Sequence, residues 1–102
     1  MKYTVKYHQK FYADMIDLKM SKRMKLKLIE KVDYISKHPK SKNEGGYGEP
    51  LAGDLKGLLK FRFMSDYRVV YKLEYDHATV IVLIVGMRKD NQIYKNVLKR
   101  VK

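Results

Sequence analysis

The segment from Gly48 to Tyr71 limits the possible folds more than any other part of the chain. A loop with glycine and proline leads into two short runs, LLKFRF and YRVVYKL, in which apolar and charged residues alternate. Such alternation is typical of strands that bury one face. Ser65 and Asp66 between the runs favour a tight turn, so the segment predicts an antiparallel hairpin. Among its charged residues are Lys60, Arg62 and Arg68.

Cations on a hairpin have two interpretations. A rigid sheet that holds several of them together can bind a phosphate group. Charge of one sign on a strand face is also common on ordinary solvated surfaces. The register decides whether Arg68 shares a face with Lys60 and Arg62, and the sequence does not fix it.

The composition indicates one basic, folded domain. The chain has 102 residues, and its 23 lysines and arginines against 11 acidic residues give a formal charge of +12. Such a field attracts polyanions, of which nucleic acid is the expected one. The hydrophobic fraction of 45% is that of a globular protein and not of a disordered basic tail.

The sequence also favours a soluble cytoplasmic protein without a membrane partner. Cysteine is absent, so the chain has neither a disulfide framework nor a thiolate metal site. The stretch from Met1 to Tyr7 is too short and too polar for a signal peptide. The longest apolar run, from Ala78 to Val85, is far shorter than a membrane span requires.

The first half of the chain predicts one strand and two helices. Lys2 to Tyr7 alternates as a half-exposed strand does, and His8 to Met20 then shows helical spacing. Ser21 offers an N-cap for a second helix, which we expect to end at His38 and Pro39. The apolar stripe of this second helix consists of Met24, Leu28, Val32 and Ile35. We expect the two helices to pack as a pair on one face of a sheet.

The second half predicts strands and a last helix. Lys40 to Gly57 has no sustained periodicity and is expected to be a loop, and Tyr75 to His77 a turn. Ala78 to Val85 is apolar on both faces, which predicts a central strand that Gly86 ends. Asn91 to Lys102 has the spacing of a short C-terminal helix. The fold class is therefore α+β: an antiparallel sheet of about four strands, with or without the first strand at one edge.

Several chemistries are excluded at the level of motifs. The chain has no Walker loop, GxGxxG, HExxH or GxSxG sequence. The histidines His8, His38 and His77 lack metal-ligand spacing, and most carboxylates stand at turn positions. We therefore expect no cofactor and no metal.

Cleavage of RNA remains open to such a chain, because it needs no metal when the adjacent 2′-hydroxyl is the nucleophile. The protein then has to orient that hydroxyl, stabilise charge on the phosphorus centre and protonate the leaving oxygen. Arginine clamps phosphate oxygens, lysine supplies a point charge or a proton, and tyrosine stacks on a base or donates a hydrogen bond. Proteins that only bind nucleic acid use the same residue types, so this argument does not select a function by itself.

Four segments resemble a known family. The runs GEPLAGDLKGLLKFRF, DYRVVYKL, VIVLIVGMRKD and IYKNVLKR are similar to the RelE and ParE superfamily of bacterial toxins, and to its RelE branch most. The resemblance covers nearly the whole chain as a single RelE-like domain. It implies an endoribonuclease that cleaves messenger RNA in the ribosomal decoding site and so inhibits translation. It also implies a monomeric toxin that a cognate antitoxin neutralises by forming a heteromer.

The resemblance implies roles for individual residues. The catalytic positions of the family match Lys60, Arg62, Arg68, Arg88 and Tyr94. Further cations are expected to bind RNA or the ribosome: Lys56, Lys72, Lys89, Lys95, Lys99 and Arg100. Arg62 stands where the family has a lysine, and because arginine does not release a proton at neutral pH, we expect it to act electrostatically. Lys60 or solvent is then the candidate for proton transfer.

Three alternatives stay open from the sequence. The ParE branch has the same fold but inhibits DNA gyrase, which needs no phosphate-centred cluster. A non-catalytic RNA-binding protein would also carry the basic field. Tyr94 has its own alternative, because it can pack with Ile93, Val97 and Leu98 instead of serving a site.

Overall fold

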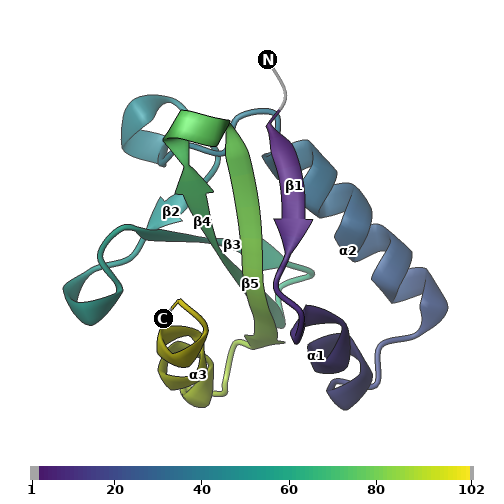
Figure 1. The fold of residues 1–102 in the computed structure, drawn as a ribbon. Helices are drawn as coiled ribbons and strands as arrows, with labels where there is room; N and C mark the ends of the chain where they lie inside the picture. The colour runs from purple at the N-terminus through teal and green to yellow at the C-terminus, as the bar shows by residue number, and fades with distance from the viewer. Residues whose placement is uncertain (1–2, 102) are drawn as a thin grey trace.

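The computed structural model describes residues 3–101, so the predicted strand residue Lys2 and the predicted helix residue Lys102 lie outside it. The described part is an α+β fold in which helices cover a sheet (Figure 1). Three single-turn 3₁₀ helices lie in the connections, at Lys42–Glu44, Gly53–Leu55 and Tyr75–His77. The main elements are β1 (Thr4–Tyr7), α1 (Phe11–Asp17), α2 (Lys22–Ile35), β2 (Glu49–Pro50), β3 (Leu58–Phe63), β4 (Tyr67–Glu74), β5 (Thr79–Met87) and α3 (Gln92–Arg100).

The sheet has five strands in the order β1-β5-β4-β3-β2. The expected hairpin is confirmed, since β3 pairs antiparallel with β4 and β4 with β5. The expectation of an antiparallel sheet is wrong at one edge, where β1 pairs parallel with β5. Backbone bonds hold β1 there, from Thr4 N–H to Ala78 O at 2.9 Å and from His8 N–H to Val82 O at 2.8 Å. The sheet is therefore mixed.

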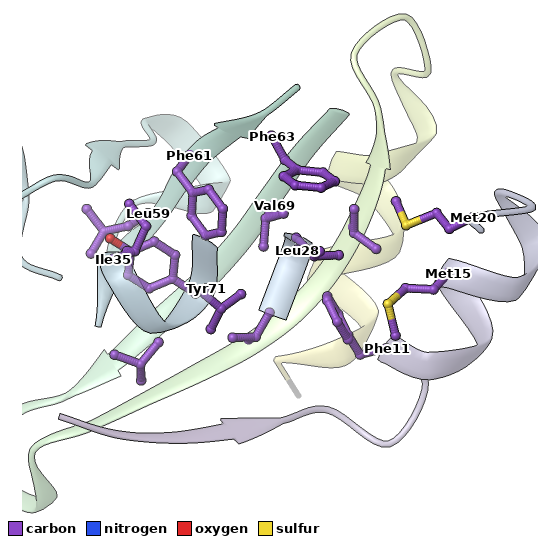
Figure 2. Close-up of a cluster of buried hydrophobic side chains, with 14 residues drawn as sticks. Phe11, Met15, Met20, Leu28, Ile35, Leu59, Phe61, Phe63, Val69 and Tyr71 are labelled. Atoms are coloured by element: carbon purple, nitrogen blue, oxygen red, sulfur yellow. The ribbon is translucent and has the colours of Figure 1, made fainter. Parts of the chain in front are cut away.

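The sheet buries both faces. One face packs against α1 and α2 through the larger core cluster, which Figure 2 shows with Phe61, Phe63 and Tyr71 from the strands and Leu28 and Ile35 from α2. The expected packing of two helices on one face is thus confirmed. The other face packs against α3 through a smaller cluster, which contains Leu58, Val70, Leu83, Ile84, Ile93 and Val97.

A bulge in β5 changes which of its residues face each of the two core clusters. Val70 pairs with Ile84, but the next residue, Tyr71, pairs with Val82, so Leu83 is an extra residue on β5. Leu83 and Ile84 both join the cluster under α3, and Val85 returns to the cluster under α1 and α2. Beyond Val82, β1 no longer pairs with β5, so the Leu83 carbonyl on that side needs another partner.

The helix boundaries differ from the expected ones. Ser21 does cap α2, because its Oγ accepts a hydrogen bond from Met24 N–H at 3.1 Å. The first helix begins only at Phe11, since His8 N–H still bonds to the sheet. The second helix ends at Ile35, the last residue of its apolar stripe, and not at His38.

The sequence predicts that Gly86 ends the last strand. In the structure Gly86 lies within β5 instead. A Cβ atom at this position would lie 2.9 Å from Cδ1 of Ile93 in α3. The glycine therefore marks a place where α3 approaches the sheet closely, and the strand continues past it to Met87.

The loop before β3 is attached to the core through Tyr71. Its hydroxyl donates a hydrogen bond of 2.7 Å to Pro39 O, and burial raises the pKa of Tyr71 well above its usual value. A Cβ atom at Gly48 would clash with the Tyr71 hydroxyl, so the loop needs glycine there. Among residues 3–101, no helix is both long and apolar enough to span a bilayer.

Candidate functional site

The hairpin register places two arginines directly opposite each other. Arg62 on β3 pairs with Arg68 on β4, and Arg68 pairs in turn with Gly86 on β5. Both arginines alternate with residues of the larger core cluster, so they belong to the face that α3 covers. Like charges directly opposite each other destabilise a sheet. A position that keeps two arginines in this arrangement is therefore suited to hold an anion between them.

Two lysines extend the basic face along the same hairpin. Lys60 lies opposite Val70 and is half-buried, and Lys72 lies opposite Leu58. Leu58 and Val70 belong to the cluster beneath α3. The two lysines opposite them therefore lie on the same face of the sheet as the arginines. The sequence expectation that Lys60, Arg62 and Arg68 share a face is consistent with this register.

The turn of the hairpin holds the Arg68 side chain. Its Nη1 donates hydrogen bonds to Tyr67 O at 3.1 Å and to Ser65 O at 3.3 Å. Met64 and Ser65 adopt left-handed backbone angles, with φ of 51° and 45°. Such angles are unfavourable for residues with a side chain. The strained turn thus fixes the carbonyl groups that orient the guanidinium.

Arg88 lies next to the hairpin, just past the end of β5. It follows Met87, the last residue of that strand, and stands in the turn before α3. Its backbone N–H donates to Asp66 O at 2.8 Å, so the hairpin turn anchors it. Arg88 is exposed, and none of Lys60, Arg62, Arg68 and Arg88 forms an ion pair with a carboxylate in the part of the chain that the structure describes.

Tyr94 reaches the same face from α3. The helix begins after Asp90, whose Oδ1 accepts a hydrogen bond from Gln92 N–H at 2.9 Å. Tyr94 lies in the first turn, is half-buried and packs against the cluster under α3. The structure thus supports the packing role considered for Tyr94, and part of the residue stays accessible to solvent.

The other expected RNA-binding cations fall into two groups. Lys56, Lys89, Lys95 and Lys99 are exposed and Lys72 is half-buried. Arg100 differs, because only 12% of its side chain is exposed and its guanidinium is engaged with Asp14. Arg100 is therefore poorly placed to bind RNA, in contrast to the expectation from the sequence.

The Asp14–Arg100 ion pair links helices on opposite faces of the sheet. Arg100 Nη1 and Nη2 donate to the two Asp14 carboxylate oxygens at 2.6 and 2.8 Å, and Nη1 also donates to Leu83 O at 2.8 Å. Asp14 accepts in addition from Val85 N–H at 3.2 Å. The pair thus supplies hydrogen-bond partners for the Leu83 carbonyl and the Val85 N–H of β5, beyond the end of β1. No local motif marks an ion pair between residues 86 positions apart.

The arrangement suits binding and stabilisation of an anion. Lys60, Arg62 and Arg68 share the face of the sheet that α3 covers, Arg88 follows the end of β5, and Tyr94 lies in the first turn of α3. In residues 3–101, no group of three or more histidine, cysteine or acidic side chains is placed to hold a metal ion. We call Lys60, Arg62, Arg68, Arg88 and Tyr94 the cationic row.

The comparisons agree on one class of protein. Residues 5–92 match the family model described as the ParE toxin of the type II toxin–antitoxin system parDE. No curated protein sequence matches the chain.

Solved structures with the same fold include toxins and toxin–antitoxin complexes. The chain is 27% identical to a chain of the toxin–antitoxin complex RelBE2 from Mycobacterium tuberculosis, with a TM-score of 0.71 over 88% of this chain and 95% of that one. A mutant of the E. coli toxin RelE in the free state is 20% identical, with a TM-score of 0.77 over 100% of both chains. A YoeB/ParE toxin from Agrobacterium tumefaciens is 19% identical, with a TM-score of 0.65 over 83% and 98%.

Proposed function

Because the chain belongs to the ParE toxin family of type II toxin–antitoxin systems, we propose that it inhibits translation by cleaving messenger RNA on the ribosome. The family membership makes it a toxin but does not select the target. The observation that carries the proposal is the cationic row, in which Arg62 and Arg68 lie directly opposite each other. A protein that only blocks another protein has no need to hold two like charges together.

The chemistry follows from what each residue can do. The 2′-oxygen of the substrate attacks the adjacent phosphorus, the bond to the 5′-oxygen breaks, and the products are a cyclic phosphate and a 5′-hydroxyl. Arg62 and Arg68 stabilise the charge that develops on the phosphate oxygens, and Arg88 adds a third guanidinium. The proton from the 2′-hydroxyl leaves to solvent, and the 5′-oxygen takes a proton from Lys60 or from water.

The ribosome has a specific task in this proposal. Arg62 and Arg88 are exposed, so RNA on the row stays in contact with water and is not enclosed. The protein by itself then does little to bend the RNA so that the 2′-oxygen lines up behind the phosphorus. A partner that holds the RNA in that geometry supplies the missing orientation, which is worth several powers of ten in rate.

A cognate antitoxin is the expected protein partner. Similar folds occur in the RelBE2 complex of M. tuberculosis and in a RelE–RelB complex from Pyrococcus horikoshii. An acidic antitoxin segment that covers the cationic row would neutralise the toxin, since the net charge of +12 favours such a partner. We expect the toxin alone to be a monomer that arrests growth when expressed, and the antitoxin to relieve that arrest.

Inhibition of DNA gyrase is the second candidate, because the matching family model is that of ParE. Two assays on the same preparation separate the candidates. In a translating extract, messenger RNA should be cut within ribosome-bound regions, and gyrase supercoiling should proceed unchanged. Blocked supercoiling with intact messenger RNA would instead assign the chain to gyrase.

A further inference from the structure

A recess of about 490 Å³ lies at the open edge of β3. β2 pairs with β3 only at Lys60 and Leu59, so within residues 3–101 no strand covers this edge from Phe61 onward. One wall comes from α2 and the other from the loop that leads into β2. The lining includes three cations and three aromatic residues, namely Lys31, Lys42, Arg62, Tyr34, Tyr47 and Phe61.

Two of the aromatic rings form a stacked pair at the surface. The ring centroids of Tyr34 and Tyr47 are 4.8 Å apart and their planes differ by 5°. His38 meets Tyr47 edge-on, with centroids 5.3 Å apart. The neighbouring Tyr34 hydroxyl raises the pKa of Tyr47 above its usual value. Tyr34 is 48% exposed, which gives the stack an edge open to a ligand.

Cations surround this aromatic pair. Lys31 Nζ lies 5.4 Å from the centroid of the Tyr34 ring. Lys42 Nζ lies 3.8 Å from Glu49 Oε1, a surface contact too weak to remove the lysine from other anions. Exposed rings with cations beside them are typical of sites that stack bases and hold phosphates of single-stranded nucleic acid.

Arg62 connects the recess to the cationic row. It lines the recess and also lies opposite Arg68 in the sheet. A strand of RNA that crosses the row therefore meets this recess as soon as it passes the edge of β3.

We propose that the recess binds a nucleotide of single-stranded RNA that flanks the cleaved bond. The base packs against the Tyr34–Tyr47 pair, and Lys31 and Lys42 hold the phosphate. This proposal rests on the function proposed above. It adds that Tyr34 and Tyr47 give the toxin a preference among the RNA bases next to the cleaved bond. Because stacking depends on the base only weakly, the preference is a graded one between bases and not an absolute one.

Binding of RNA that cannot be cleaved tests the recess separately from catalysis. The probe is a short single-stranded RNA with 2′-O-methyl groups throughout, which blocks the nucleophile. Its affinity is measured by fluorescence anisotropy at fixed salt, and the tyrosine ring signals are followed by NMR. Tyr34→Ala should weaken binding roughly 5- to 100-fold, and Tyr34→Phe should keep most of it. The ring signals of Tyr34 and Tyr47 should shift when the RNA is added.

Tyr12 on α1 provides a matched control. It is 59% exposed, and Lys25 Nζ lies 5.2 Å from its ring centroid, so Tyr12→Ala removes the same kind of group from another surface. Binding by Tyr12→Ala should stay within about twofold of the unchanged protein, since only general charge attraction acts there. Circular dichroism should show that all the variants are folded.

Three results would overturn the proposal. Equal losses for Tyr34→Ala and Tyr12→Ala would do so, as would RNA binding that leaves the Tyr34 and Tyr47 signals unshifted. An acidic peptide that shifts these signals where the RNA does not would assign the recess to a protein partner. Loss of binding in Tyr34→Ala without any cleavage in a translating extract would support the recess and reject only the proposed nuclease.

Discussion

Replacing Arg100 by methionine should destabilise the fold by about 3 kcal/mol, because removing one partner of a buried ion pair leaves the other charge unpaired. The two side chains are only 12% and 11% exposed, so water compensates poorly. The change removes two bonds to the Asp14 carboxylate and one to Leu83 O. Breaking a buried ion pair by removing one partner costs about 3–5 kcal/mol, and the lower end applies because some solvent still reaches these two side chains.

Urea unfolding followed by circular dichroism measures this effect. A loss of about 3 kcal/mol is a large part of the roughly 5–15 kcal/mol that stabilises an ordinary domain. With an m-value on the order of 1–3 kcal/mol per molar urea, the midpoint should fall by roughly 1–3 M. Lys99→Met is the matched control, since it removes the same charge from the neighbouring, exposed position of α3.

The double variant sharpens the test. Asp14→Asn combined with Arg100→Met should cost less than the sum of the two single changes, because the second change removes the charge that the first left unpaired. If Arg100→Met unfolded at the same urea concentration as Lys99→Met, the ion pair would not fix α3 on the sheet and the reasoning would fail.

Three further changes give distinct outcomes. Tyr71→Phe should cost about 1–3 kcal/mol in urea unfolding because Pro39 O loses its buried donor; an unchanged midpoint would refute this. Gly86→Ala should cost about 1–3 kcal/mol by pushing Ile93 and α3 off the sheet, and NMR should show displaced α3 signals. Cleavage kept in Tyr94→Phe but lost in Tyr94→Ala would assign this ring to stacking, whereas loss in both would assign its hydroxyl to the chemistry.

The local pattern of the sequence was sufficient for most elements. Alternation in LLKFRF and YRVVYKL indicated the hairpin, and Ser65 and Asp66 indicated its turn, because turn and strand preferences depend on neighbouring residues. Ser21 indicated the start of α2 for the same reason. The likeness of four segments to RelE and ParE toxins led to the superfamily that the comparisons support.

Long-range contacts account for what the sequence missed. Alternation in β1 shows which residues face the core, but it does not show whether β1 runs parallel to β5. Gly86 resembles a strand end, and only the approach of Ile93 explains why glycine stands inside β5. Arg100 resembles the lysines around it, and its role depends on Asp14, which lies 86 residues earlier in the chain.

Messenger RNA cleavage by Arg88→Ala in a translating extract tests the central claim most directly. Arg88 is exposed and contributes to the row through its guanidinium, so the variant should fold normally and lose on the order of a hundredfold in cleavage rate. Lys27→Ala removes the same charge from the exposed side of α2, which packs on the opposite face of the sheet, and should reduce the rate by only a small factor. Equal cleavage by the two folded variants would contradict the account, because the basic charge would then act only as a general attraction for RNA.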